Sequence, residues 1–224
     1  MWYNAEGDAF MKLGKVFILG DSYSTFEKCV PEGYAIWYQK DIVNDTDVNS
    51  VEQTWWKQLI NSTDSEILLN CSWSGTTICH TGYGGDCSDK SFIARFDRLA
   101  EEGYFEKNNV DTLLVFGGTN DNWANSPIGE PMYSDWKKED LFSFLPAMGY
   151  LTQRLKDVLP QTRIIFIINS DLKKEITEGI KTACQKKGIE AIELKNIEKQ
   201  SGHPNKAGMT QIKEQIMEYL ISNS

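Results

Sequence analysis

The sequence predicts an α/β fold in which a buried parallel sheet lies between layers of helices. Three observations lead to this prediction. Five short runs are mainly apolar, and four of them contain no polar residue, which is typical of parallel strands buried on both faces. Segments with the apolar spacing of helices separate these runs. The chain of 224 residues is also long enough for one such domain to bury a full core.

The predicted elements alternate along the chain, as in a doubly wound α/β sandwich. Helical patterns occupy residues 54–61, 92–99, 146–158, 176–184 and 212–220. Pro146 suits the first turn of its helix, where the missing N–H is not needed. Two long irregular stretches, 27–53 and 122–141, are of a length that is usually functional in a compact domain. The strand-like runs are residues 16–19, 67–69, 113–116, 164–168 and 191–194.

Residues 15–224 are expected to form a single domain after an N-terminal extension of residues 1–14. The extension carries Glu6 and Asp8 and lacks the apolar segment of a secretion signal, which favours a cytoplasmic protein. The net charge of −9 argues against nucleic acid or an anionic membrane as a partner. No apolar run approaches the roughly 18 residues of a transmembrane helix.

The five cysteines are odd in number and form no CxxC pair. Without a secretion signal they are expected to be reduced thiols in or near the core. The chain shows no ligand spacing typical of a metal site, no glycine-rich phosphate loop and no dinucleotide fingerprint. We therefore predict a protein that works without a metal or a cofactor. The cysteines are Cys29, Cys71, Cys79, Cys87 and Cys184.

Four polar segments stand where an α/β active site would be expected, at the ends of predicted strands and before the last helix. Ser22 directly follows the first strand, and His203 stands just before the last helix. A serine hydroxyl is a weak nucleophile until a positioned base takes its proton, and the chain has only two histidines. Ser22 and His203 are therefore a candidate nucleophile and base. The four segments are residues 20–22, 70–76, 117–121 and 202–205.

These segments resemble the four motif blocks of the SGNH (GDSL-like) hydrolase family of esterases and lipases. The family is named after a Ser, a Gly, an Asn and a His, one in each block. The resemblance spans roughly residues 15–221 and implies a three-layer α/β/α sandwich, flavodoxin-like, with a five-stranded parallel sheet. The four positions are Ser22 in Gly-Asp-Ser, Gly75 in Asn-Cys-Ser-Trp-Ser-Gly, Asn120 in Gly-Thr-Asn-Asp and His203 in Gly-His-Pro.

The resemblance also implies a role for each residue. Ser22 would attack an ester carbonyl, and His203 would accept its proton and return it to the leaving alcohol. The oxyanion would be held by the backbone N–H groups of Ser22 and Gly75 and by the side-chain amide of Asn120. Glycine lets the backbone come close to a substrate, and an asparagine amide is a neutral donor that can be aimed at developing charge.

One position departs from the family pattern. The family usually has an aspartate three residues before the histidine, and here that residue is Gln200. The amide oxygen of Gln200 could accept from the imidazole N–H, and a backbone carbonyl could do the same. Glu198 and Asp171 are alternative carboxylates that the sequence does not place. We therefore expect a Ser–His dyad rather than a complete triad.

Residues beside the blocks are candidates for supporting roles. Asp21 and Asp121 are expected to fix loop backbones around the site. Trp73, Trp123 and His80 are candidates for substrate contact, because rigid aromatic faces suit stacking on a sugar or an acyl group. Each of these residues also has a purely structural alternative. Ser22 could be a helix N-cap, and His203 a turn residue. His80 could be a hydrogen-bond partner within its loop, and the tryptophans could be packing residues.

Together these features predict a serine hydrolase of small acyl esters that forms an acyl-enzyme, with O-acetylated carbohydrates among its substrates. The predicted partner is thus a small-molecule ester or an acylated sugar. Two alternatives remain at this point. One is an acyltransferase of the same fold, and the other is a glycan-binding domain that has lost turnover.

Overall fold

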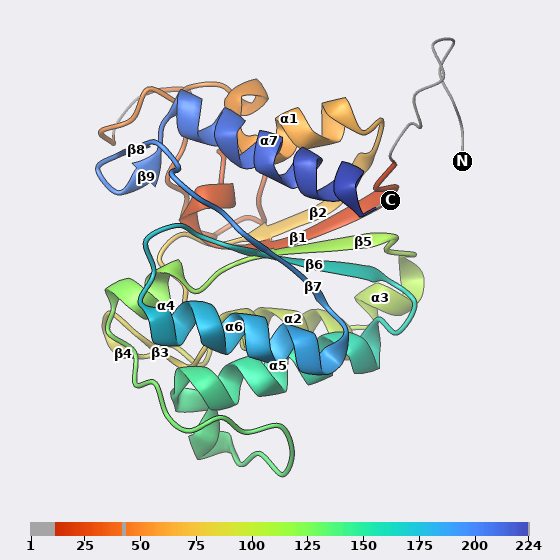
Figure 1. Ribbon diagram of the computed structural model, residues 1–224, viewed down its shortest axis with the longest axis vertical. Helices are drawn as coiled ribbons and strands as arrows, with labels where there is room; N and C mark the ends of the chain where they lie inside the picture. The colour runs from red at the N-terminus through yellow and green to blue at the C-terminus, as the bar shows by residue number, and fades with distance from the viewer. Residues whose placement is uncertain (1–11, 42–43, 224) are drawn as a thin grey trace.

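The centre of the protein is a five-stranded sheet in which every pair of neighbouring strands is parallel (Figure 1). The computed structural model describes residues 12–41 and 44–223. The strand order is β2-β1-β5-β6-β7. The strands are β1 (Lys15–Gly20), β2 (Glu66–Ser72), β5 (Thr112–Phe116), β6 (Arg163–Ile168) and β7 (Glu190–Glu193).

Helices cover both faces of this sheet, which confirms the predicted three-layer fold. One layer holds α1 (Trp55–Ser62) and α7 (Lys206–Ser222), and the opposite layer holds α2 (Phe92–Glu101), α5 (Phe144–Val158) and α6 (Lys174–Lys187) (Figure 1). Alternate side chains of each strand enter opposite cores because successive residues point to opposite faces. Residues 16–19 of β1 are therefore all apolar, since Phe17 and Leu19 enter one core and Val16 and Ile18 the other.

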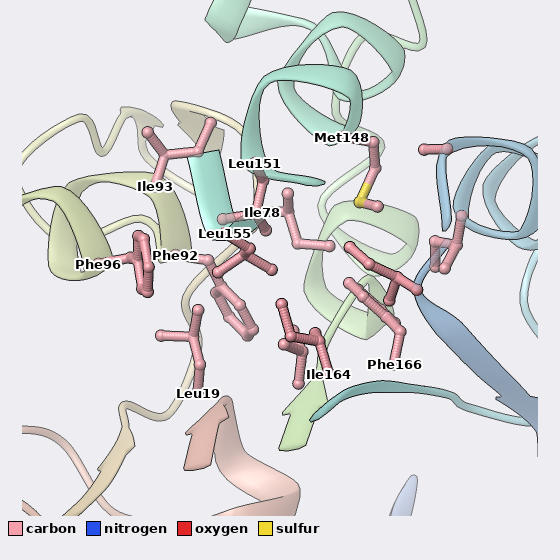
Figure 2. Packing of buried hydrophobic residues seen from close by; sticks show 14 of the residues in the cluster. Leu19, Ile78, Phe92, Ile93, Phe96, Met148, Leu151, Leu155, Ile164 and Phe166 are labelled. Atoms are coloured by element: carbon pink, nitrogen blue, oxygen red, sulfur yellow. The ribbon is translucent and has the colours of Figure 1, made fainter. Parts of the chain in front are cut away.

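The core beneath α2 and α5 shows how the helical apolar stripes are used. Phe92 of α2, Leu151 of α5 and Phe166 of β6 meet there, each fully buried (Figure 2). Burying such a side chain contributes about 1.5–3 kcal/mol relative to leaving it exposed. Pro146 lies in the first turn of α5, as predicted, although the helix begins two residues earlier at Phe144.

The second strand is longer than the prediction of residues 67–69. Asn70, Cys71 and Ser72 belong to β2 and pair in register with β1, rather than forming a loop after the strand. The Ser72 hydroxyl donates to Asn70 Oδ1 at 2.6 Å, and Asn70 Nδ2 donates to the carbonyl of Ser24 at 2.8 Å. Because these polar groups bond to one another and to the turn after β1, the strand can continue through them.

The ordered domain also begins earlier than residue 15. Leu13 is 2% exposed and packs in the core beneath α1 and α7. Its N–H donates to Ser65 Oγ at 2.9 Å, and its carbonyl accepts from Thr112 Oγ1 at 2.7 Å. Residues 1–11 of the expected extension lie outside the described residues.

Short elements complete the fold at the ends of the main strands. The cysteines are all free thiols, and four of them are buried. Within residues 12–41 and 44–223, no helix has the length and apolar character needed to cross a membrane. The short elements are η1 (Ser22–Ser24), η2 (Val51–Gln53), β3 (Thr81–Gly82), β4 (Gly85–Asp86), α3 (Tyr104–Lys107), α4 (Thr119–Trp123), η3 (Lys138–Phe142), β8 (Lys199–Gln200) and β9 (His203–Pro204).

Candidate active site

Ser22 and His203 meet beyond the carboxyl end of β1. Ser22 is the first residue of the 3₁₀ turn η1, and His203 lies in the short strand β9. The distance from Ser22 Oγ to His203 Nε2 is 2.9 Å, across 181 residues of sequence. Both residues are largely buried, at 2% and 6% exposed. The structure thus gives the geometry that transfer of a proton from the hydroxyl to the imidazole requires.

The turn that carries Ser22 is tightly built. A Cβ at Gly20 would come within 2.5 Å of Ser72 Oγ, so the chain can pass this point only as glycine. Asp21 is the N-cap of η1, and its Oδ1 accepts from the N–H of Tyr23 at 3.1 Å. The capping role considered for Ser22 therefore belongs to Asp21, which leaves the Ser22 hydroxyl free to bond to His203.

The other nitrogen of His203 faces a backbone carbonyl. His203 Nδ1 lies 3.2 Å from the carbonyl oxygen of Ser201, an acceptor that the sequence allowed for. Gln200, the other orienting group that the sequence allowed, donates through Nε2 to Asp45 Oδ1 at 2.6 Å. Its side chain is therefore engaged with the long loop before α1 and not with the imidazole. Neither Glu198, which binds Asn205, nor Asp171, which binds Lys199, bonds to the ring.

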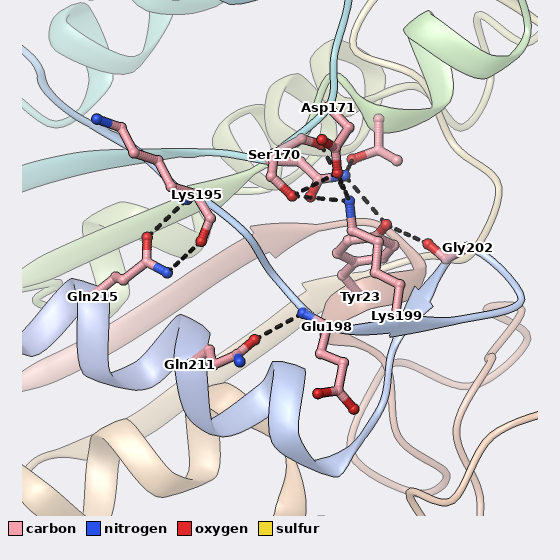
Figure 3. A network of polar contacts seen from close by, with 11 residues as sticks. Tyr23, Ser170, Asp171, Lys195, Glu198, Lys199, Gly202, Gln211 and Gln215 are labelled. Carbon is pink, nitrogen blue, oxygen red and sulfur yellow. Dashed lines mark hydrogen bonds and ion pairs between the residues drawn. The ribbon is translucent and has the colours of Figure 1, made fainter.

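The turn before His203 is anchored from several directions. Ser201 and Gly202 have φ values of 48° and 79°, so both lie in the left-handed region. The Ser201 hydroxyl donates to the Asp45 carboxylate. The Tyr23 hydroxyl donates to the carbonyl of Gly202 at 2.6 Å (Figure 3). Because these contacts come from η1 and from the long loop, the Ser201 carbonyl is presented to the imidazole by tertiary contacts.

Aromatic rings surround His203. The indole of Trp37 lies face to face with the imidazole, with ring centroids 3.6 Å apart and planes within 7°. Trp123 approaches edge-on at 5.5 Å, and Tyr23 is tilted at 5.4 Å. The pKa of His203 is lowered to about 4, chiefly by burial and in part by Lys199, while the bond to the Ser201 carbonyl opposes the shift. The imidazole is therefore neutral at pH 7 and available as a base.

Asn120 lies at the start of α4 and is 2% exposed. Its Nδ2 donates to the carbonyl of Thr76 at 3.0 Å, and its Oδ1 accepts from the hydroxyl of Tyr83 at 3.0 Å. Since an amide nitrogen carries two hydrogens, one N–H remains for another acceptor. Gly75, next to Thr76, has a φ of 78°, which favours glycine. The second and third blocks are thus joined through the Asn120–Thr76 bond.

A buried arginine that the sequence prediction missed ties the first two blocks together. Arg95 of α2 is 1% exposed, and its Nη2 donates to the carbonyl of Gly20 at 3.1 Å and to Thr76 Oγ1 at 3.0 Å. Its Nη1 donates to the carbonyl of Cys71. The available signal was its place on the apolar stripe of α2, three residues after Phe92, where a charge is buried only if paired.

The two aspartates beside the blocks hold backbone groups, as expected. Asp121 accepts from the N–H groups of Ile78 and Cys79 at 2.9 and 3.1 Å. Burial raises the pKa of Asp21 to about 7 and that of Asp121 to about 6. In each case hydrogen bonds from the backbone oppose the effect of burial. The carboxylates therefore support the loops rather than touching His203.

The three candidates for substrate contact lie in different surroundings. Trp123 is 38% exposed beside His203. Trp73 stacks on Tyr34 with ring centroids 4.2 Å apart, which favours a packing role over substrate contact. His80 Nδ1 lies 2.9 Å from Ser91 Oγ, and the residue lines a cavity to which neither Ser22 nor His203 contributes. His80 therefore acts as a loop hydrogen-bond partner, and its predicted substrate contact is not supported.

Known proteins resemble this chain over nearly its whole length. The model of the GDSL-like lipase/acylhydrolase family matches residues 14–220. A crystal structure from Bacteroides ovatus, described as a GDSL-like lipase, has a TM-score of 0.88 and 44% identity and covers 95% of this chain and 100% of its own. A second, from Bacteroides uniformis and described in the same way, has a TM-score of 0.86 and 44% identity, covering 93% and 96%.

More distant structures share the fold alone. A family two carbohydrate esterase from Cellvibrio japonicus has a TM-score of 0.63 at 16% identity, covering 97% of this chain and 64% of its own. A search of curated proteins finds no match.

Proposed function

The chain belongs to the GDSL-like lipase/acylhydrolase family and is an ester hydrolase, and we propose that Ser22 and His203 form its catalytic dyad. The observation that carries this proposal is the 2.9 Å distance between Ser22 Oγ and His203 Nε2. The neutral imidazole, held with Nδ1 toward the Ser201 carbonyl, has its Nε2 lone pair directed to the hydroxyl.

In the proposed mechanism Ser22 Oγ attacks the ester carbonyl while His203 Nε2 takes its proton. The tetrahedral intermediate collapses when the imidazolium returns this proton to the leaving alcohol, and an acyl-enzyme on Ser22 remains. A water molecule, deprotonated by His203, then attacks the acyl carbon and releases the acid with regeneration of the Ser22 hydroxyl. No other co-reactant enters this sequence of steps.

The oxyanion is proposed to accept from three donors. These are the backbone N–H groups of Ser22 and Gly75 and the free N–H of the Asn120 amide. The hydroxyl of Tyr83 supports this role, because its bond to Asn120 Oδ1 leaves the Nδ2 group as the donor on the opposite side of the amide. A donor fixed in advance stabilises the oxyanion without reorganising during the reaction.

The substrate class that we propose is a small acyl ester on a carbohydrate. The support comes from two exposed aromatic rings at the rim of the site. Trp123, beside His203, is 38% exposed, and Tyr83, bonded to Asn120, is 59% exposed. Flat aromatic faces suit the apolar face of a pyranose. The carbohydrate esterases among the distant structures agree with this choice but share only the fold.

The dyad is tested by the Ser22→Ala variant. We expect hydrolysis of p-nitrophenyl acetate to fall by at least about 10³-fold, because the variant has no nucleophile to acylate. A fluorophosphonate probe should label the wild-type protein at Ser22 and leave the variant unlabelled, as shown by peptide mass spectrometry. Acetate release from an acetylated oligosaccharide, assayed beside p-nitrophenyl acetate, tests the substrate class.

The control is Ser62→Ala, which removes an exposed hydroxyl of α1 that bonds only to the carbonyl of Gln58. This variant should keep wild-type turnover and labelling. Undiminished turnover in folded Ser22→Ala would refute the dyad. Hydrolysis of p-nitrophenyl acetate by the wild-type protein without acetate release from the oligosaccharide would refute the carbohydrate substrate.

A further inference from the structure

Resting on the proposed dyad, we propose that Trp37 is a positioning residue that takes over part of the work of the absent orienting carboxylate. Its indole fixes the plane of the His203 imidazole and stabilises the imidazolium that forms when Ser22 loses its proton. Trp37 belongs to the long stretch of residues 27–53, for which the sequence predicted a functional role without naming a residue.

The stacking geometry distinguishes Trp37 from the other rings around His203. Its centroid lies 3.6 Å from that of the imidazole, and the two planes differ by 7°. Tyr23 and Trp123 lie 5.4 and 5.5 Å away, with interplanar angles of 56° and 65°. Only the Trp37 ring, among these three, presents its π-face to the imidazole. A rotation of the imidazole out of its plane would collide with the indole.

The backbone of Trp37 is tied to the turn of the nucleophile itself. The N–H of Trp37 donates to Thr25 Oγ1 at 2.9 Å, and the Thr25 hydroxyl donates to the carbonyl of Ser22 at 3.0 Å. The carbonyl of Trp37 accepts from Asn44 Nδ2 at 2.6 Å. The indole is therefore held against His203 by the same short chain of bonds that holds Ser22.

The indole N–H does not explain where the ring lies. Trp37 Nε1 is buried and bonds to no protein group among residues 12–41 and 44–223. Buried tryptophan N–H groups usually find a partner. Since the Trp37 N–H has no such partner, the contact that the position of this ring provides is the stacking on His203.

The charged groups near His203 do not stabilise a protonated imidazole, so this role falls to the π-face of Trp37. No carboxylate of the described residues bonds to the imidazole, and its Nδ1 partner is a neutral carbonyl. The positive charge of Lys199 opposes protonation of the ring. The negative face of an indole attracts a cation lying on it, and tryptophan does so best. The groups facing this region from the packed elements are Lys199, Asp171, Asp45, Asp21 and the hydroxyls of Tyr23 and Tyr38.

The test compares Trp37→Leu and Trp37→Phe with the wild-type protein. Trp37→Leu should lower kcat by about tenfold with KM changed less than about twofold, since the imidazolium forms only during the reaction. The acid limb of the kcat/KM profile should move to lower pH, because an aliphatic neighbour favours the neutral ring. Trp37→Phe keeps a π-face and should retain most of kcat with a smaller shift in the same direction.

Trp136→Leu is the matched control. Trp136 is also a partly buried indole with an unpartnered N–H, and it packs edge-on against Tyr150 at 5.7 Å, outside the dyad. Its loss should lower the melting temperature without moving kcat or the acid limb. If Trp37→Leu fails to fold, Trp37→Phe alone carries the test through its acid limb.

Three outcomes would overturn the proposal. They are an unmoved acid limb in the Trp37 variants, a limb that moves to higher pH, and equal losses of kcat in Trp37→Leu and Trp37→Phe. Failure of the dyad is separately visible, because the fluorophosphonate would then leave Ser22 of the wild-type protein unlabelled.

Discussion

The hydrogen-bond acceptor beside Nδ1 determines which nitrogen of His203 is free to take a proton. The Ser201 carbonyl can only accept, so at 3.2 Å it selects the tautomer with hydrogen on Nδ1 and leaves Nε2 free to face Ser22. A carbonyl orients the ring as a carboxylate would, but it lacks the full negative charge that stabilises an imidazolium. This difference is the reason that the aromatic face of Trp37 matters at this site.

Asn120 offers a residue-scale prediction for the oxyanion. We expect Asn120→Ala to lower kcat by about 10²–10³-fold, because one of three proposed donors to the developing charge is lost. KM should change little, since the ground-state carbonyl is held less tightly than the oxyanion. Steady-state kinetics with p-nitrophenyl acetate check this.

The companion variant is Tyr83→Phe, which removes the hydroxyl that bonds to Asn120 Oδ1. It should cost less than Asn120→Ala, about three- to tenfold in kcat, because the donor remains but is less firmly aimed. A kcat in Asn120→Ala equal to that of the wild-type protein would remove Asn120 from the oxyanion hole.

At the scale of elements, the site is assembled by short turns and a loop that stand outside the central sheet. The hairpin of β8 and β9 has only two residues in each strand, yet it supplies both His203, from β9, and the Ser201 carbonyl, from the turn. The loop before α1 supplies Asp45, which bonds to the side chains of Gln200 and Ser201. The turn keeps its left-handed residues because these contacts hold it.

Asp45→Ala tests whether the loop positions the hairpin. We expect kcat to fall by about three- to tenfold with KM nearly unchanged, because the Ser201 carbonyl would be less firmly presented to His203. Asp45→Asn, which keeps an acceptor oxygen, should recover part of this loss. Stopped assays with p-nitrophenyl acetate measure both variants.

The control for this variant is Asp47→Ala, on the same loop. Asp47 Oδ1 accepts from the N–H of Lys206 at the start of α7 and bonds neither to Gln200 nor to Ser201. It should leave kcat unchanged. Equal effects of the Asp45 and Asp47 variants would mean that acidic charge on the loop, rather than the anchored turn, is what matters.

At the scale of the whole molecule, the strand order explains why these segments meet. In the order β2-β1-β5-β6-β7, the chain leaves β1 toward one neighbour and returns in β5 on the other side. Ligand sites of open α/β sheets lie beyond the carboxyl ends of strands at such a point. The segments that follow β1 and β5 carry Ser22 and Asn120, and the fold thus places both residues beyond the same edge of the sheet.

The buried carboxylate of Asp21 makes a prediction about the stability of the whole protein. Its pKa is raised from 3.8 to about 7, so the folded state binds more protons than the unfolded state between these values. The contribution of Asp21 to stability is therefore greatest below about pH 4 and is lost as the pH rises toward 7. The lowered pKa of His203 acts in the opposite direction between about pH 4 and 6.5.

The Asp21→Asn variant isolates the contribution that titration of Asp21 makes to the stability of the protein. An amide does not titrate, and its oxygen can still accept from the N–H of Tyr23. The free energy of unfolding of the variant, relative to that of the wild-type protein, should rise by on the order of 3 kcal/mol between pH 4 and pH 7.5. Urea unfolding at several pH values measures it, and a difference independent of pH would show that Asp21 is ionised throughout.

Much of the fold could be predicted from local pattern. The five strands were found from their short apolar runs, and β2 was underestimated by the most, since Asn70 and Ser72 continue it with polar groups that bond to each other. The pair Ser22 and His203 could be selected because the serine follows a strand and histidines are few. The choice between Gln200 and a backbone carbonyl could not be made, because spacing along the chain does not show what a side chain contacts.

The sequence alone determined the layers, the family and the residues with the right chemistry, since periodicity and motif spacing are local properties. Only the tertiary structure decided what holds those residues. Trp37, Asp45 and Arg95 act through contacts with segments that are distant in sequence, in the case of Asp45 by more than 150 residues. Such contacts depend on how the packed layers bring the loops together, which no local pattern records.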